Sequence, residues 1–314
     1  MQKIFRTHKD MDAVEDILKN IYGSGIAVTG RIPVSGGDIN RAYALTLSDG
    51  SRLFMKANRK ENEDFFRAEA EGLEALRTAG AISVPAVIAR GSDDRESFLL
   101  LEYIEEGRRS PGASEELGRR LAELHLADTE KMTADNDKTN AASYVPGGRY
   151  GFLHDNYIGA GFQCNEPADS WTEFFIDRRL RPQFERASYY WDSGYRKTVD
   201  RFLDKAEQYL AEPKQPSLLH GDLWAGNYMI DSCGEPWLID PAAYVGHAEA
   251  DLAMTELFGG FDRRFYDAYR ETAEIDPGYA DRRDLYNLYH LLNHLNLFGG
   301  SYLYSVKSIV SRYI

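Results

Sequence analysis

One stretch of eight residues, from His220 to Asn227 with the sequence HGDLWAGN, constrains the chain more than any other feature. A short apolar run follows it and ends at Asp240, thirteen residues beyond Asn227. Phosphoryl transfer from ATP needs an Asp that holds the attacking hydroxyl and takes its proton, and an Asn and a second Asp that hold Mg²⁺ against the phosphates. The order and spacing therefore predict Asp222 as the catalytic base and Asn227 and Asp240 as the Mg²⁺ ligands.

The spacing also predicts the local structure around these residues. Gly221 and Gly226 permit the chain to curl, so that Asn227 faces the same side as the second Asp. The turn dipeptide Cys233-Gly234 precedes the apolar run Trp237–Ile239, which indicates a hairpin joining the catalytic loop to the metal-binding strand. Either fragment alone also occurs as an ordinary turn or strand cap, but the two together favour phosphotransfer machinery.

The first part of the chain offers candidates for holding the nucleotide phosphates. Gly36 and Gly37 lie between apolar segments and leave backbone N–H groups accessible to phosphate oxygens, although a Gly-Gly hairpin without a ligand has the same pattern. Residues 42–47 and 52–57 read as two strands across the turn 48–50, and Lys56 lies near the end of the second. We predict that Lys56 contacts the phosphates.

A helix over residues 65–76 provides the acidic partner that such a lysine requires. Glu69 and Glu71 are both candidates, and they point about 200° apart on a helix with ~100° per residue. Only one of them can therefore face Lys56.

The apolar run 97–104 predicts a buried strand that leads into a hinge, where backbone groups near Glu102 and Tyr103 would bind adenine. Polar and turn-forming residues at 105–112 follow it, so we predict an N-terminal ATP-binding lobe at 1–103 and a C-terminal catalytic and substrate-binding lobe at 104–314. A helix is expected from Ser114, as N-cap, to Leu126.

Composition limits the partners and the compartment. Against 37 Lys and Arg residues stand 50 Asp and Glu residues, a formal net charge of −13 that argues against a nucleic-acid partner. No segment approaches the ~18 apolar residues of a membrane span, and no secretory signal is recognisable. The two cysteines form no CxxC motif, which suits a reducing compartment. We expect a cytoplasmic protein, monomeric or homodimeric, that binds no membrane.

Taken together, these residues resemble the fructosamine/ketosamine kinase family, within the aminoglycoside and choline kinase-like phosphotransferases that are related to protein kinases. The resemblance covers nearly the whole chain, and its most specific marks are the runs 219–227, 240–242, 246–261 and 288–299. It favours Glu69 over Glu71. It implies an α+β, bilobal protein-kinase-like fold, with a small antiparallel-sheet N-lobe carrying one major helix and a larger, mainly helical C-lobe.

The resemblance implies ATP-dependent phosphorylation of the 3-hydroxyl of ketosamines, which are fructosamine or ribulosamine adducts of small amines or of protein lysines. The 3-phosphate is unstable and releases the amine, so the implied role is protein deglycation. A kinase for another small hydroxylated amine, of the aminoglycoside, choline or homoserine type, is the alternative within enzymes. A nucleotide-binding pseudokinase is the alternative outside them.

Two further residues are candidates for the substrate side. Trp224 lies two residues beyond the predicted base, so its indole would stack on the sugar, exclude water, or wedge the loop in place. His294 would bind substrate hydroxyls or satisfy a buried hydrogen bond. His290 and His294 are one helical turn apart and suit a transition metal, but they lack the central Glu of HExxH, and Asp and Asn suit Mg²⁺ better.

Overall fold

The computed structural model describes residues 12–34, 39–129 and 149–314. By internal contacts the chain divides into two compact units. Unit 1 holds the described residues up to Glu74 together with Pro85–Glu105, and unit 2 holds Ala75–Val84 and the described residues of Glu106–Ile314. The boundary expected between residues 103 and 104 stays a prediction, because a division by contacts does not show which part folds alone.

Unit 1 is built on a five-stranded antiparallel sheet of order β1-β2-β3-β5-β4. Its strands are β1 Val28–Val34, β2 Arg41–Leu47, β3 Arg52–Arg59, β4 Val87–Ser92 and β5 Glu96–Glu102, and its helices are α1 Asp12–Tyr22, the short 3-10 segment η2 Lys60–Asn62 and most of α2 Glu63–Ala79. The two strands expected around the turn 48–50 are thus confirmed as β2 and β3.

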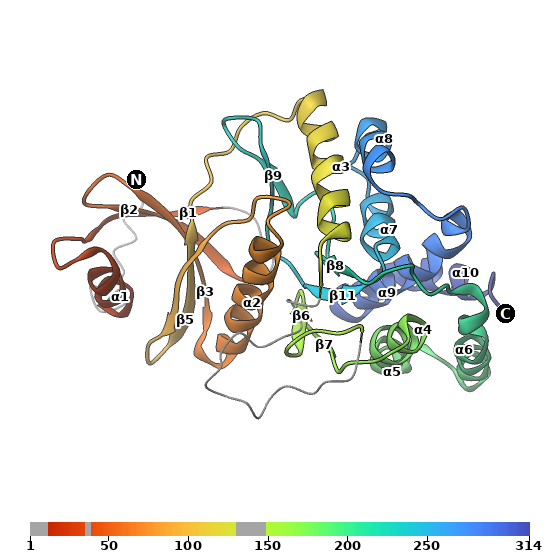
Figure 1. The fold of residues 1–314 in the computed structure, drawn as a ribbon. Coiled ribbons are helices and arrows are strands. Elements are labelled where there is room, and N and C mark those ends of the chain that lie inside the picture. The colour runs from red at the N-terminus through yellow and green to blue at the C-terminus, as the bar shows by residue number, and fades with distance from the viewer. Residues whose placement is uncertain (1–11, 35–38, 130–148) are drawn as a thin grey trace. The chain divides into compact units, whose positions relative to one another are not determined.

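Alternation along β3 decides where its lysine points. Leu53, Met55 and Ala57 belong to one hydrophobic core with Val14 and Leu18 of α1. Side chains of a strand alternate between faces, so Lys56 projects from the opposite face of the sheet. That face meets α2, which buries Phe66, Leu73 and Leu76 along its apolar stripe (Figure 1).

Unit 2 is mainly helical. Its helices are α3 Pro111–Leu126, α4 Trp171–Phe174, the π-helix η3 Phe175–Leu180, α5 Arg181–Arg186, α6 Ser193–Lys205, α7 Glu249–Leu257, α8 Arg263–Thr272, α9 Tyr279–Phe298 and α10 Leu303–Val310, with 3-10 segments η4 Ser188–Tyr190, η5 Ala206–Tyr209 and η6 Gly300–Tyr302. Its strands are β6 Asn156–Ile158, β7 Gly161–Gln163, β8 Ser217–Leu219, β9 Tyr228–Ile230, β10 Pro236–Leu238 and β11 Tyr244–Gly246. Helix α3 packs against α8, and α7 packs against α9 (Figure 1).

The helix expected from Ser114 begins earlier than predicted. Its N-cap is Ser110, whose side chain accepts a hydrogen bond from the Ala113 backbone N–H. Pro111 occupies the first turn, where its fixed φ is already helical and its missing N–H costs nothing. The prediction of Ser114 as the cap was therefore wrong, and Ser114 instead donates to Asp262, the N-cap of α8.

Three two-stranded ribbons lie in unit 2, and two of them flank the HGDLWAGN loop. Strand β8 leads into the loop and pairs with β11, while β9 leads out of it and pairs with β10. The hairpin predicted across Cys233-Gly234 is confirmed as β9–β10, closed by a hydrogen bond from the Gly234 N–H to the Asp231 carbonyl.

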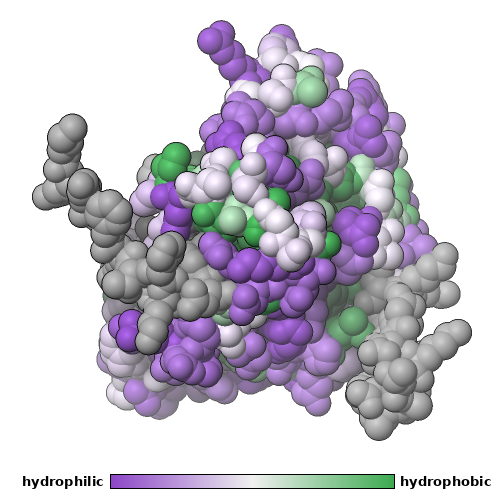
Figure 2. Space-filling model, turned by 90° about the vertical axis from the view of Figure 1, so that its left-hand side faces the viewer, coloured by the Kyte–Doolittle hydropathy of each residue, from purple (hydrophilic) through white to green (hydrophobic). Residues whose placement is uncertain are grey.

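The surface agrees with the polar composition. On the face drawn in Figure 2, hydrophilic residues predominate and hydrophobic ones form separate spots. Across the described part of the chain, no helix is both long and apolar enough to cross a membrane.

Candidate active site

In unit 1, the structure joins the predicted lysine to one of its two candidate partners. The Lys56 ammonium lies 2.6 Å from a Glu69 carboxylate oxygen, and the two residues are only 6% and 9% exposed. Glu71 accepts hydrogen bonds from the Arg67 guanidinium on both carboxylate oxygens, at 3.1 Å. The geometry thus agrees with the choice of Glu69 and shows how the helix separates the two carboxylates.

The structure describes the two predicted adenine-binding residues but not the predicted phosphate-binding glycines. Glu102 ends β5, and its backbone N–H donates to the Ala86 carbonyl at 2.9 Å, so this group is already engaged. Tyr103 follows, with the Arg52 guanidinium 3.7 Å above its ring. Gly36 and Gly37 lie outside the described residues.

In unit 2, the loop brings the predicted base and amide together. The Asn227 side-chain amide donates to the Asp222 backbone carbonyl at 2.8 Å and to its carboxylate at 3.2 Å. Gly221 has φ +83°, and a Cβ there would lie 2.1 Å from the Ala242 carbonyl oxygen. Only glycine fits this turn, because both the backbone conformation and the space exclude a side chain. The curl predicted from the glycine spacing is found here.

The second aspartate stands at the end of the hairpin in an unusual backbone conformation. Asp240 has φ 56°, the one positive φ outside glycine among the described residues. Burial and, after it, the negative charge of Asp240 raise the pKa of Asp222 from 3.8 to about 7, while the hydrogen bond from Asn227 lowers it. The electrostatic interaction between the two carboxylates creates a region of negative charge that a cation would relieve.

This donor set fits Mg²⁺. The Asn227 nitrogen is directed to Asp222, so the amide oxygen would face a cation, and Asp240 would supply a carboxylate. The described residues contain no group of three or more His, Cys, Asp and Glu side chains that could hold a metal ion by themselves. Mg²⁺ typically binds through one or two carboxylates and takes its other ligands from substrate phosphates and water.

A buried aspartate outside the motif binds backbone N–H groups of the HGDLWAGN loop. Asp251, on α7 and 2% exposed, accepts hydrogen bonds from the backbone N–H groups of His220 at 2.7 Å and Gly221 at 2.9 Å. His125 of α3 lies 3.3 Å from the same carboxylate. The sequence placed Asp251 in a specific run but left its role open, because its partners are backbone groups about thirty residues away.

His220 braces the loop through its two ring nitrogens. Its Nε2 lies 2.8 Å from the Ile239 carbonyl, and its Nδ1 accepts from the Asp222 backbone N–H at 3.2 Å. A carbonyl only accepts, so the proton is on Nε2, and burial lowers the pKa of this imidazole and keeps it neutral. His220 therefore links Ile239, the residue before Asp240, to Asp222.

The two predicted substrate residues are both accessible. Trp224 is 43% exposed, and its ring covers Gly226, where a Cβ would lie 2.3 Å from the indole. His294 is half-buried among the rings of Phe258, Phe298 and Tyr302 at centroid distances of 4.9, 5.3 and 5.2 Å. Its Nδ1 donates to the His290 carbonyl at 2.8 Å, so its Nε2 is left as an acceptor.

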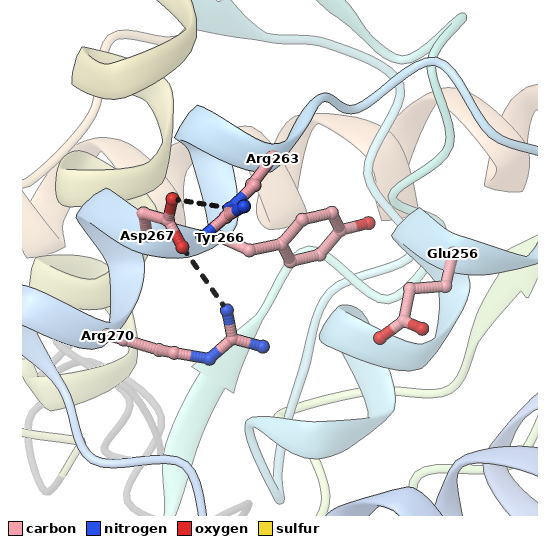
Figure 3. Close-up of a pocket in the computed structure, with 5 residues that line it drawn as sticks. All are labelled: Glu256, Arg263, Tyr266, Asp267 and Arg270. Atoms are coloured by element: carbon pink, nitrogen blue, oxygen red, sulfur yellow. Dashed lines mark hydrogen bonds and ion pairs between the residues drawn. The ribbon is translucent and has the colours of Figure 1, made fainter.

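A pocket of 440 Å³ lies away from these residues, on α7 and α8 (Figure 3). Glu256, Arg263, Tyr266, Asp267 and Arg270 line it. Asp267 pairs with Arg263 at 3.2 Å and with Arg270 at 3.7 Å, and Glu256 accepts from Arg283. Its charged groups thus have partners within the lining or, for Glu256, in Arg283 beside it, and the lining contains none of the predicted catalytic residues.

Comparisons with known proteins show the family of this chain. A sequence model of the family described as fructosamine kinase matches residues 10–314. A probable ketoamine kinase from Synechocystis sp. is 40% identical over 298 residues, 92% of each chain. A chloroplastic protein-ribulosamine 3-kinase from rice, Oryza sativa, is 38% identical over 295 residues, 93% of this chain and 81% of that one. A solved structure assigned to the fructosamine-3-kinases, from Haemophilus somnus, has a TM-score of 0.81 at 25% identity and covers 96% of each chain.

The fold and the catalytic loop therefore define a phosphotransferase of the protein-kinase-like class, with the α+β architecture predicted from the sequence. Within that class, the chain belongs to the fructosamine kinase family.

Proposed function

We propose that the protein is an ATP-dependent kinase that phosphorylates the 3-hydroxyl of ketosamines and so promotes deglycation. The observation that carries this proposal is the Asp222 carboxylate, held by Asn227 and raised to a pKa of about 7 by burial and the charge of Asp240. The family of the chain and the names of its relatives, ketoamine kinase and protein-ribulosamine 3-kinase, support the choice of acceptor.

The residues of unit 1 bind the nucleotide. Lys56 neutralises phosphate oxygens, and Glu69 holds its ammonium in place at 2.6 Å. Backbone groups at Glu102 and Tyr103 serve the adenine; because the Glu102 N–H is engaged by Ala86, we assign the contact to the remaining backbone groups there. Gly36 and Gly37 provide backbone N–H groups for the phosphates.

The residues of unit 2 serve the metal and the acceptor. Asn227 and Asp240 are the Mg²⁺ ligands, and the ion would neutralise charge on the phosphates. Asp222 orients the acceptor hydroxyl and accepts its proton, which requires the ionised carboxylate; a cation beside Asp240 favours that form by offsetting its charge. Positioning and charge neutralisation provide most of the rate gain.

On the acceptor side, we assign Trp224 to stacking on the sugar and His294 to hydrogen bonding. The exposed indole offers a flat apolar face, and the unprotonated Nε2 of His294 accepts a hydrogen bond from a hydroxyl. The partner is a small ketosamine or a glycated protein lysine. Cys164 and Cys233 are free thiols, which supports a reducing compartment such as the cytoplasm.

The proposal is tested by ATP consumption with Mg²⁺ against ribulosamines, fructosamines, an aminoglycoside and choline, with the new phosphate located by NMR. Phosphate on the ketosamine 3-hydroxyl is the expected result. Phosphorylation of the aminoglycoside or choline alone would contradict the ketosamine assignment and leave the catalytic residues in place. ATP binding without turnover of any acceptor would favour a pseudokinase.

A further inference from the structure

The backbone after the metal-binding aspartate needs an explanation, because Asp240 is strained. A left-handed conformation, seen here at φ 56°, is strained for a residue other than glycine. Such a conformation persists only when the surrounding structure holds it. The question is therefore which groups hold residues 241–246, which follow it directly.

Backbone contacts secure part of this segment. The Ala242 N–H donates to the His220 carbonyl at 2.9 Å, and strand β11 pairs with β8. Val245 also exchanges two hydrogen bonds with Gly151, at 2.8 and 3.0 Å. These bonds fix the N–H of Ala242 and the far end of the segment, but they do not use the carbonyls of Ala242 and Ala243.

Side-chain amides from the β6–β7 hairpin satisfy those two carbonyls. Gln163 Nε2 donates to the Ala242 carbonyl at 3.1 Å, and Asn156 Nδ2 donates to the Ala243 carbonyl at 2.7 Å. Both amides are buried, with 1% and 3% of the residue exposed. A buried amide group without a hydrogen-bond partner is costly. The side-chain amide oxygens of Gln163 and Asn156 therefore need donors as well, and those donors help fix which way each amide points.

A third residue sets that orientation. The Tyr289 hydroxyl on α9 donates to Gln163 Oε1 at 2.6 Å, which turns the Gln163 nitrogen toward Asn156 Oδ1 at 2.7 Å and the Ala242 carbonyl. Reversing the Gln163 amide would bring its oxygen against the Ala242 carbonyl oxygen and Asn156 Oδ1, which both only accept. The hydrogen bonds therefore run in one direction, from Tyr289 to the segment after Asp240.

We propose that Gln163, oriented by Tyr289 and assisted by Asn156, is a positioning residue that holds residues 241–246. By holding this segment, it keeps the Asp240 carboxylate in the conformation that binds the metal. This inference rests on the proposed function of Asp240 as a Mg²⁺ ligand. The amides act through the carbonyls of Ala242 and Ala243 and touch neither the nucleotide nor the acceptor.

The test compares Gln163→Met with Gln183→Met in the full-length protein. Gln183 is a matched control, since it is also a buried glutamine, 2% exposed, but its amide pairs with Asn293 and Asn296 and not with residues 241–246. The rate of amide hydrogen exchange in a peptide covering residues 241–246 measures how firmly this segment is held. Titration with AMP-PNP, with and without Mg²⁺, reports its effect on metal-dependent nucleotide binding.

We expect faster exchange in 241–246 and roughly fivefold weaker Mg²⁺-dependent AMP-PNP binding for Gln163→Met, the scale of one lost hydrogen bond, and neither change for Gln183→Met. Tyr289→Phe removes one hydroxyl and keeps the ring, so it serves if Gln163→Met does not fold. It should give the same changes, and the double variant should be no worse than Gln163→Met alone.

Unchanged exchange in 241–246 would overturn the inference. Faster exchange with unchanged Mg²⁺-dependent binding would overturn the positioning role. Equal effects in Gln183→Met would also overturn it, because they would show that losing any buried glutamine loosens the protein. Asp240→Asn separates this from the proposed function: wild-type Mg²⁺-dependent binding in that variant would contradict Asp240 as a ligand, whatever the exchange result.

Discussion

The two units support their catalytic groups in different ways. In unit 1, Lys56 and Glu69 form an ion pair directly between a strand and a helix. In unit 2, Asp222 lies on a loop whose backbone is held by Asp251 of α7 and, within the loop, by His220, whose ring also reaches the Ile239 carbonyl. The comparison indicates that function in unit 1 depends on two side chains, and in unit 2 on a backbone shape that several buried groups maintain.

The largest expected effect is at Asp240, the one carboxylate among the two proposed Mg²⁺ ligands. Asp240→Ala should abolish Mg²⁺-dependent nucleotide binding, measured by calorimetry with and without the ion. Asp267→Ala, an exposed aspartate of α8, is the control and should bind as wild type does. Unchanged nucleotide affinity of Asp240→Ala in magnesium would contradict its role.

Next in size is the ion pair of unit 1. Lys56→Met and Glu69→Gln should each lower kcat/KM roughly a hundredfold, the scale of losing one preorganised electrostatic group. Glu71→Gln, which alters the nearby carboxylate paired with Arg67, should stay within about twofold of wild type. Equal losses in Glu69→Gln and Glu71→Gln would break the distinction between the two helix faces.

The same pair should contribute little to stability. In the double variant Lys56→Met/Glu69→Gln the desolvation cost of two buried charges disappears together with their attraction. The Tm should therefore remain close to that of wild type while activity stays low. A large drop in Tm would show that the pair supports the fold of unit 1 and would weaken the comparison.

Unit 2 should show the opposite pattern at Asp251. Asp251→Asn directs an NH₂ group toward one of the backbone N–H groups that the carboxylate now accepts from, those of His220 and Gly221. We expect the free energy of unfolding to fall by about 3 kcal/mol and kcat/KM to fall about tenfold, measured by urea unfolding and steady-state kinetics. Wild-type stability would mean that the loop does not depend on this anchor.

The smallest effect is a pH dependence of stability. Burial is the main cause that lowers the pKa of His247 and of His290 from 6.5 to about 3, so both are neutral in the folded protein. The unfolded chain binds protons below about 6.5, so stability is lost as pH falls through that value, by about 2 kcal/mol per histidine at pH 5. His290→Gln should therefore lose about 2 kcal/mol less than wild type between pH 7.5 and 5 in urea unfolding. An identical loss would contradict a neutral His290.

The sequence motif pointed to the candidate residues more readily than to the groups that hold them. Asp222, Asn227 and Asp240 could be proposed because their order and spacing are local, and the confirmed β9–β10 hairpin follows from one turn dipeptide. Glu69 needed a comparison with known kinases, since helical geometry alone separates it from Glu71 without choosing between them.

Residues whose partners are remote gave no usable signal. Gln163 and Asn156 bind carbonyls about eighty residues away, and Tyr289 reaches Gln163 across 126 residues. Their register follows from how the β6–β7 hairpin and α9 pack, which single-sequence periodicity does not determine. The N-cap at Ser110 was missed for a simpler reason, because the first turn of α3 contains a proline and a glycine that read as loop residues.

The most direct test of the account follows a single ketosamine through wild type and Asp222→Asn side by side, with AMP-PNP affinity measured for both proteins. Wild type should place phosphate on the 3-hydroxyl, and Asp222→Asn should bind the nucleotide almost as well while turning over at least a hundredfold more slowly. Near-normal turnover in Asp222→Asn, or wild-type phosphate on another hydroxyl, would contradict the account.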